Sequence, residues 1–309
     1  MTNPTIASNL KIGDALLSQG KAKEAMSFYQ EAKKIAQQIS KGQGYEENLS
    51  LNAIINERIG DVEFMENKIK EAYDLFTNTL ETWDILVRME PANHEWLRNK
   101  SLLTHKLGEC SLRKGNKSEA IRYAQNALVI KEELAKSDTA NYQFQMDLST
   151  GYGVLGDILL EDKQPELALD NHLKCLETLR MIEANSSDSE GLERNISIAL
   201  EKIGDSYVMM NNQIDAAIHY LGCLQIRKRF FSKYPDNLKI LKDNINIHRK
   251  FAELMFRKGK TNTGWDYFKE AHRLVDLANT KDPSPQNFNN SFLIASRMKE
   301  LINLYGSPS

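Results

Sequence analysis

One short motif recurs at a nearly constant interval and constrains the fold more than any other feature of the chain. It consists of a large apolar residue, a small residue and an acidic residue, and its small central residues are Gly13, Gly60, Gly108, Gly156, Gly204 and Ala252. The interval is about 48 residues, a period typical of repeat architectures in which one structural unit stacks on the next. We count positions within each of the six repeats from this central residue, position 0.

Other positions of the repeat also keep their residue type. Position +12 is Ala or Gly, position +19 is small, and position +16 is bulky in every repeat except the third, which has Ala124. The apolar residues follow a helical period. Small residues facing large ones let two helices approach closely. The pattern therefore predicts two helices in each repeat.

Helix boundaries are also marked in the sequence. Position +7 is occupied by Gly20, Asn67, Gly115, Lys163, Asn211 and Gly259. Gly and Asn tolerate the left-handed backbone conformation that ends many helices. The first helix of a repeat is expected to start near position −15, where Asn93, Asn141, Ser189 and Asn237 are suitable N-caps. Each repeat is thus predicted to be an antiparallel helix pair with a tight turn at +7.

A single helix pair exposes an apolar face, so the pairs are expected to stack into a solenoid. We predict an all-α fold that forms one domain over residues 1–309. The predicted pairs cover residues 3–40, 45–90, 93–137, 141–186, 189–234 and 237–282. A last helix at 287–305 is expected to cap the open face of the sixth pair.

The combination of Gly at 0, Ala at +12, an aromatic residue at +16 and Ala at +19 resembles the tetratricopeptide repeat (TPR) family. The resemblance extends from about residue 5 to residue 280 and implies a right-handed α-solenoid of TPR-like helix pairs. The repeat is longer than the unit of roughly 34 residues that is usual in that family. It is similar to long-unit bacterial arrays, which are often associated with caspase-like CHAT peptidases and signalling ATPases. The resemblance also implies that positions −3, +1 and +5 of the first helix project into a concave groove.

Composition narrows the classes of function. Lysine and arginine number 40 and aspartate and glutamate 42, so the chain lacks the basic excess expected of a nucleic-acid-binding protein. It has no run of about 18 apolar residues, which argues against a membrane protein. The N-terminus lacks a secretory signal, and three cysteines do not suggest a disulfide framework. We therefore expect a cytoplasmic protein that binds neither nucleic acid nor membrane.

The sequence around each candidate catalytic, metal-binding or cofactor-binding motif argues against that function. Residues 151–156 match GxGxxG, but they lie within a predicted helix and not at a strand–helix turn. Cys175 and Cys223 each follow a histidine at helical spacing, yet both occupy the small-residue position +19, which favours packing over metal ligation. Cys110 lacks a suitably placed histidine. We expect no metal, no cofactor and no enzymatic activity.

Acidic residues occupy position +1 in all six repeats: Asp14, Asp61, Glu109, Asp157, Asp205 and Glu253. Taken alone, they indicate a groove for a basic peptide. Position −2 is Lys or Arg in every repeat except the fourth, which has Val154. A base three residues before an acid can pair with it on one helix face. This self-neutralising arrangement is the favoured interpretation, and it makes Asp157 the acid most available to a ligand.

The sequence therefore predicts a non-catalytic scaffold that binds a peptide or protein segment in its groove. The alternative is a regulatory sensor subunit whose superhelix changes on partner binding and controls a separate effector, such as a peptidase or a signalling ATPase. The candidate partner-binding residues are Arg58, Asp61, His105, Glu109, Arg113, Asp157, Glu161, Asp205 and Met209.

Overall fold

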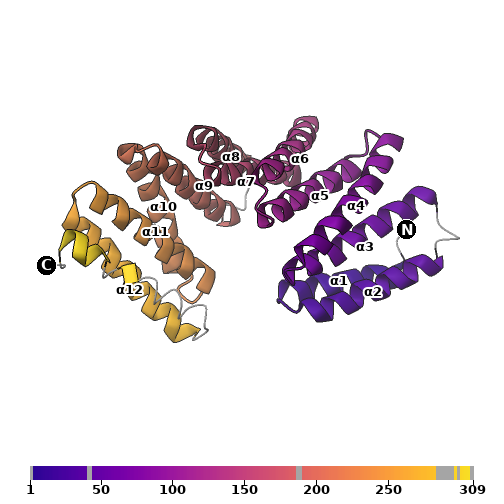
Figure 1. Ribbon diagram of the computed structural model, residues 1–309, viewed down its shortest axis with the longest axis horizontal. Helices are drawn as coiled ribbons and strands as arrows, with labels where there is room; N and C mark the ends of the chain where they lie inside the picture. The colour runs from indigo at the N-terminus through magenta and orange to yellow at the C-terminus, as the bar shows by residue number, and fades with distance from the viewer. Residues whose placement is uncertain (1–2, 40–43, 186–189, 283–295, 298–299, 307–309) are drawn as a thin grey trace. The chain divides into compact units, whose positions relative to one another are not determined.

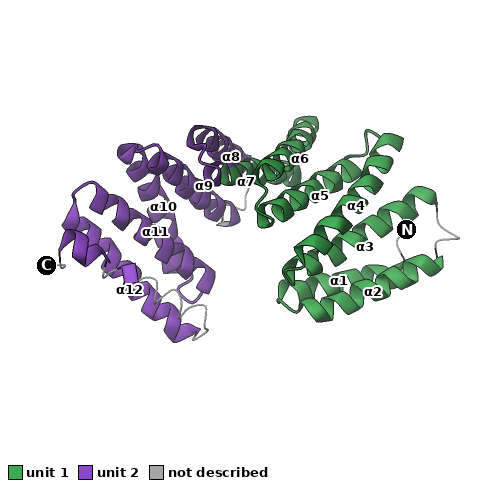
Figure 2. Cartoon of the chain, in the orientation of Figure 1, with its two compact units in different colours: residues 1–158 green, residues 159–309 purple. Residues whose placement is uncertain are grey.

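The computed structural model describes residues 3–39, 44–185, 190–282, 296–297 and 300–306. Twelve helices make up most of these ranges, and the described residues contain no strand. The chain divides into two compact units, residues 1–158 and 159–309, shown in Figure 2. The all-α prediction and the TPR-like helix-pair prediction are confirmed. The expectation of one domain over residues 1–309 stays a prediction.

Unit 1 contains the first three repeats and most of α7 (Figure 1). Its helices are α1 (Pro4–Ser18), α2 (Ala22–Ile39), α3 (Tyr45–Met65), α4 (Ile69–Met89), α5 (His94–Arg113), α6 (Lys117–Ser137) and α7 (Tyr142–Glu161). Helix α7 crosses the boundary between the units after Ile158. Odd-numbered helices carry the first half of each repeat and even-numbered helices the second.

Unit 2 contains the end of α7, the short helical stretch 300–305 and five longer helices. They are α8 (Pro165–Asn185), α9 (Glu190–Met209), α10 (Gln213–Lys233), α11 (Leu238–Arg257) and α12 (Thr261–Lys281). From α1 to α6 in unit 1, and from α8 to α12 in unit 2, each helix packs against the next one in sequence.

The turn at position +7 has the same backbone geometry in all six repeats. Its residue has a positive φ of 58–78°, including Asn67, Lys163 and Asn211, which lack the freedom of glycine. In each turn two backbone N–H groups bond back to carbonyls of the preceding helix, as in Gly20 N–H to Leu17 O at 2.9 Å and Lys21 N–H to Leu16 O at 3.0 Å. This is the Schellman motif. Asn93, Asn141 and Asn237 cap helix N-termini with their side chains as predicted, whereas Ser189 lies outside the described residues.

The recurring glycine at position 0 is explained by the side chain at +16. A Cβ atom added to Gly13, Gly60 or Gly204 would lie 2.4, 2.2 or 2.4 Å from the ring of Tyr29, Phe76 or Tyr220, respectively. The ring therefore occupies the space that a larger residue at position 0 would need. In the third repeat +16 is Ala124, and a Cβ added to Gly108 would meet nothing closer than 3.4 Å.

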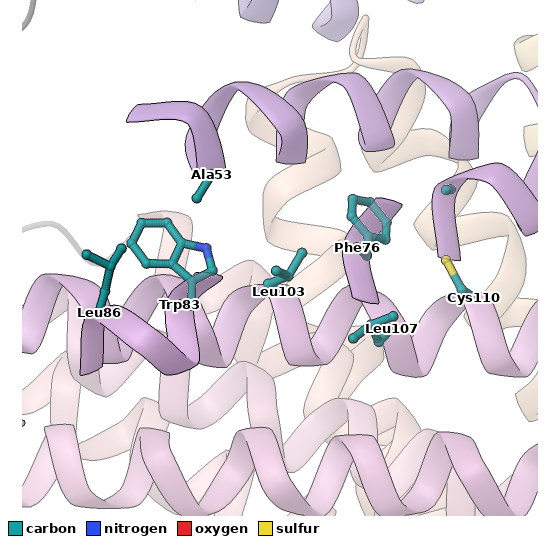
Figure 3. Packing of buried hydrophobic residues seen from close by; sticks show 8 residues of the cluster. Ala53, Phe76, Trp83, Leu86, Leu103, Leu107 and Cys110 are labelled. Carbon is teal, nitrogen blue, oxygen red and sulfur yellow. The ribbon is translucent and has the colours of Figure 1, made fainter. Parts of the chain in front are cut away.

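The core of each helix pair is built from the positions that keep their residue type in every repeat. All residues at +12, +16 and +19 are buried. Figure 3 shows Phe76 and Trp83 of α4 between the helix that carries Ala53 and the helix that carries Leu103 and Leu107. Burial of a large apolar side chain stabilises the fold by about 1.5–3 kcal/mol, so these contacts account for helix pairing and for stacking.

The predicted capping helix is described only in part. Residues 296–297 and 300–305 are helical, and 287–295 and 298–299 lie outside the described residues. Leu301 is buried against the α11–α12 pair in a cluster that includes Phe256 and Trp265. Tyr305 stacks on Phe256 with ring centroids 5.1 Å apart. The described part of this segment therefore covers apolar surface of the sixth repeat.

Candidate functional site

The carboxylates at position +1 form ion pairs between repeats. Asp14 pairs with Arg58 at 2.8 Å, Asp61 with Lys106 at 2.7 Å, and Asp205 with Lys250 at 2.6 Å. Each base stands at position −2 of the following repeat. We call these contacts the cross-repeat ion pairs. The sequence predicted pairing with the base three residues earlier on the same helix, whereas these three acids bond a base of the neighbouring odd-numbered helix.

The tyrosines at +16 complete two of these contacts. The Tyr29 hydroxyl donates to Asp14 at 2.7 Å, and the Tyr220 hydroxyl donates to Asp205 at 2.6 Å. Burial, followed by the adjacent carboxylate, raises the pKa of both tyrosines. Asp14 and Asp205 are therefore bound by both a tyrosine and a base. These acids hold neighbouring helices together, which reduces the negative charge that they offer to a ligand.

Two buried glutamates at position −3 lie beside the bases of the cross-repeat ion pairs. Glu201 accepts from Arg227 at 2.6 Å and from Lys250 at 2.5 Å. Glu57, the equivalent residue of repeat 2, accepts from the Trp83 indole N–H at 2.6 Å and lies 3.8 Å from Lys106. Burial would raise the pKa of Glu201, but the charges of Lys250 and Arg227 lower it overall. Burial dominates at Glu57 and raises its pKa.

The third repeat lacks this arrangement. Because a base at position −2 pairs with the +1 acid of the preceding repeat, Val154 removes the base of Glu109 and not that of Asp157. Within the described part of the chain, the one ion pair of Glu109 is with His105, at 3.7 Å, and its side chain is 50% exposed. Asp157 is half-buried. The prediction that Asp157 is the most available acid was therefore wrong, and Glu109 takes that place.

A pocket of about 180 Å³ opens between α9, α10 and α11. Its lining residues are Asp205, Val208, Tyr220, Arg249, Lys250, Glu253, Leu254 and Arg257. Small-molecule sites usually measure about 300–1,000 Å³, so this pocket has room for one side chain and not for a cofactor. Its residues come from positions −3, −2, +1, +2, +4, +5 and +16, and thus include the positions that the TPR resemblance assigns to the groove.

The pocket has one cation without a carboxylate partner among the described residues. Asp205 is bound to Lys250, and Glu253 is bound to Arg249 at 3.0 Å and lies 3.6 Å from Arg297. No ion pair within the described ranges holds Arg257, which is exposed. The predicted set included Asp205 but missed Arg257. The repeat register could have found it, since Arg257 stands at +5 like Arg113.

The remaining predicted residues lie at separate places on the two units. Arg58 and Asp61 take part in cross-repeat ion pairs, while the Arg113 guanidinium lies 5.3 Å from the centre of the Phe64 ring. Met209 is 46% exposed at the end of α9. Glu161 is exposed at the end of α7.

The excluded chemistries gain no support from the structure. The GxGxxG match lies within α7. Burial raises the pKa of Cys110 to about 11 and that of Cys223 to about 12, so neither thiol is an activated nucleophile. The described residues hold no group of three His, Cys, Asp or Glu side chains arranged for a metal ion. None of the described helices is long and apolar enough to cross a bilayer.

Solved structures with the same fold are TPR-repeat proteins. BtubC (BKLC) from P. vanneervenii superposes with a TM-score of 0.64 at 15% identity, covering 85% of this chain and 94% of that chain. A STAND protein with a tetratricopeptide repeat sensor, PH0952 from Pyrococcus horikoshii, gives 0.61 at 17% identity, over 97% of this chain and 38% of that one.

The quorum sensor NprR from B. thuringiensis, in its apo form, gives a TM-score of 0.58 at 15% identity, covering 94% of this chain and 68% of that chain. No family model matches the sequence. No curated protein matches it either. At these identities the similarity shows the TPR-like helical repeat fold.

Proposed function

We propose that this protein is a non-catalytic scaffold that binds a peptide or protein segment through the groove-facing positions of its odd-numbered helices. The observation that carries the proposal is the pocket between α9, α10 and α11, which has room for one side chain and lies at those positions. Solved structures of the same fold include proteins described as sensors, which supports a role in interaction or regulation.

Charge in the pocket indicates the kind of side chain that it accepts. Three cations and two carboxylates line it, and the carboxylates are occupied by Lys250 and Arg249. Arg257 remains for a ligand. Its planar guanidinium can bind a carboxylate through two parallel hydrogen bonds. We propose that the bound segment places an acidic side chain beside Arg257, the opposite of the basic peptide that the +1 acids alone suggested.

The test is a selection of peptides from a random display library on the purified protein. Peptides selected on the wild type should contain an acidic residue and should lose at least about tenfold in affinity for Arg257→Glu, as expected for a charge pair replaced by repulsion. Arg180→Glu is the matched control, because Arg180 is an exposed arginine of unit 2 that does not line the pocket. Failure to select any peptide, or equal loss in both variants, would contradict the proposal.

The predicted partner-binding residues divide into two groups under this proposal. Arg58, Asp61 and Asp205 hold neighbouring helices and shape the groove. His105, Glu109, Arg113, Asp157, Glu161 and Met209 are proposed to contact the bound segment. Variants of the second group should change affinity without a large change in stability.

A second candidate function is a regulatory sensor, favoured by the similarity to the STAND protein and to NprR, which are described as carrying a sensor and as a quorum sensor. In this case a bound segment changes the pitch of the helical array and thereby switches a separate effector. Small-angle scattering with and without a selected peptide separates the two candidates. A scaffold should keep its radius of gyration, whereas a sensor should become more compact.

A further inference from the structure

A lysine side chain is buried in unit 1, and its amino group has no partner among the described residues. Lys131 of α6 is 2% exposed. No hydrogen bond or ion pair within the described ranges holds its amino group. Burial lowers its pKa, and the charges that act on it are those of Asp147, Arg98 and Glu109. Asp147 is itself bound to Arg98 at 2.5 Å. A buried charge without a partner is costly, so natural proteins usually pair it.

The equivalent residues of two other repeats have partners. Lys131 stands at position +23, where repeat 2 has Trp83 and repeat 5 has Arg227. Trp83 donates to Glu57 and Arg227 pairs with Glu201. Both acceptors stand at position −3. Repeat 3 has His105 at −3, so the carboxylate that the donor at +23 bonds in those repeats is missing here.

Side chains around this missing carboxylate are also shorter than in the other repeats. Position +16 is Ala124, where repeats 1, 2 and 5 have Tyr or Phe, and position −2 of the following repeat is Val154 in place of Lys or Arg. Gly151 of α7 leaves room for the lysine, because an added Cβ would lie 3.1 Å from Lys131 Cδ and 3.8 Å from Nζ. His105, at a groove-facing position, has a side chain that is 17% exposed.

We propose that the α5–α6–α7 junction is a carboxylate-binding site, in which an acidic group from outside the chain enters beside His105 and pairs with Lys131. The ligand carboxylate takes the place that Glu201 fills in repeat 5, and the His105 imidazole is its second hydrogen-bond partner. The carboxylate belongs either to an acidic side chain of a bound peptide or to a small free acid. This site lies within unit 1 and does not depend on the pocket around Arg257.

The experiment measures thermal unfolding of the full chain with two probes at constant ionic strength. One is sodium acetate compared with sodium chloride, and the other is a capped Gly-Glu-Gly peptide compared with Gly-Gln-Gly. We expect at least one carboxylate probe to raise the midpoint by about 2 °C or more over its control, as for a ligand well above its Kd. Response to acetate alone identifies a free acid, and response to the peptide identifies a side chain.

Two variants make the result specific. His105→Glu supplies an internal carboxylate, and Lys131→Met removes the charge with little change in shape. Both should raise the midpoint without ligand and abolish the response to carboxylate. Lys136→Met, an exposed lysine on the same helix, is the control and should respond like the wild type. The proposal is overturned if no probe acts on the wild type, or if His105→Glu and Lys131→Met keep the full response.

Discussion

The junctions α9–α10–α11 and α5–α6–α7 occupy equivalent places in the repeat but have different polar interactions. In the first, Glu201 and Arg227 are buried and bonded, and Lys250 joins Glu201 to Asp205, which also accepts from Tyr220. In the second, the equivalent residues two repeats earlier are His105, Lys131, Val154, Glu109 and Ala124. Of the described polar contacts, a single one at 3.7 Å between His105 and Glu109 joins members of this second set.

The difference shows that the polar residues are not needed to form the helix pairs. Both junctions keep small residues at +12 and +19, and these positions are buried in both. Helix packing is therefore set by the apolar and small positions, and the polar positions vary as a group. Where one acidic member is lost, as at His105, its cation is left without a partner among the described residues.

The largest effect is expected at Glu201. Glu201→Ala leaves Arg227 and Lys250 without their shared carboxylate, and removing one member of a buried ion pair costs about 3–5 kcal/mol of unfolding free energy. His105→Ala at the equivalent position should cost less than about 1 kcal/mol, since it removes a weak, partly exposed contact. Urea denaturation measures both. Similar losses in the two variants would contradict the comparison.

The second-largest effect on stability is expected from substitution of the glycine at position 0. Gly204→Ala places a Cβ 2.4 Å from the Tyr220 ring, which is hydrogen-bonded to Asp205 and resists movement. We expect a loss of about 1–3 kcal/mol from overpacking. Gly108→Ala meets nothing closer than 3.4 Å and gains helix propensity of up to about 1 kcal/mol. Thermal unfolding should show opposite shifts, and a loss at both sites would show that ring contact is not the cause.

The dependence of stability on pH should differ between Glu201 and its counterpart in repeat 2, Glu57. The pKa of Glu201 is lowered in the folded state, so its contribution is present above the ordinary pKa of about 4.3 and is lost as pH falls. The pKa of Glu57 is raised, so its contribution is present below the ordinary pKa and is lost as pH rises from there toward the raised pKa of the folded state. Relative to wild type, the loss of stability in Glu201→Gln should grow from pH 3 to pH 6, by about 1.4 kcal/mol per unit of pKa shift.

Glu57→Gln is the matched variant for this measurement. It should become more favourable relative to wild type over the same pH range, since it removes a carboxylate that burial keeps from ionising. Denaturant unfolding at several pH values measures both trends. Parallel slopes for the two variants would show that the charges of Arg227 and Lys250 do not distinguish these sites.

The repeat pattern predicted the helix pairs because their contacts recur at fixed positions. The turn at +7, the caps at Asn93, Asn141 and Asn237, and the buried residues at +12, +16 and +19 depend on neighbours that the repeat period identifies. Each of these features is local to one helix pair. A residue's type and its position in the repeat were sufficient to place it.

The ion pairs could not be placed in the same way. Lys106 lies three residues before Glu109 in sequence but pairs with Asp61 of the preceding repeat, on the neighbouring helix. Which acid a lysine reaches depends on the offset between two neighbouring repeats. The sequence of neither helix alone determines that offset. Burial of Lys131 likewise depends on Gly151, a residue of the next repeat. For this reason the sequence indicated Asp157, and not Glu109, as the acid most available to a ligand.

The smallest predicted effect tests that offset directly. Val154→Lys restores the missing base, and if a base at position −2 pairs across repeats it should bind Glu109. The gain should be about 0.2–1 kcal/mol, because the pair is partly exposed. A double-mutant cycle with Glu109→Gln isolates this contact, and a second cycle with Asp157→Asn measures the pair expected along the helix. A larger coupling to Glu109 supports the cross-repeat register. A larger coupling to Asp157 would show that the base at position −2 pairs along its own helix at this junction. The lack of a cation beside Glu109 would then have a cause other than Val154.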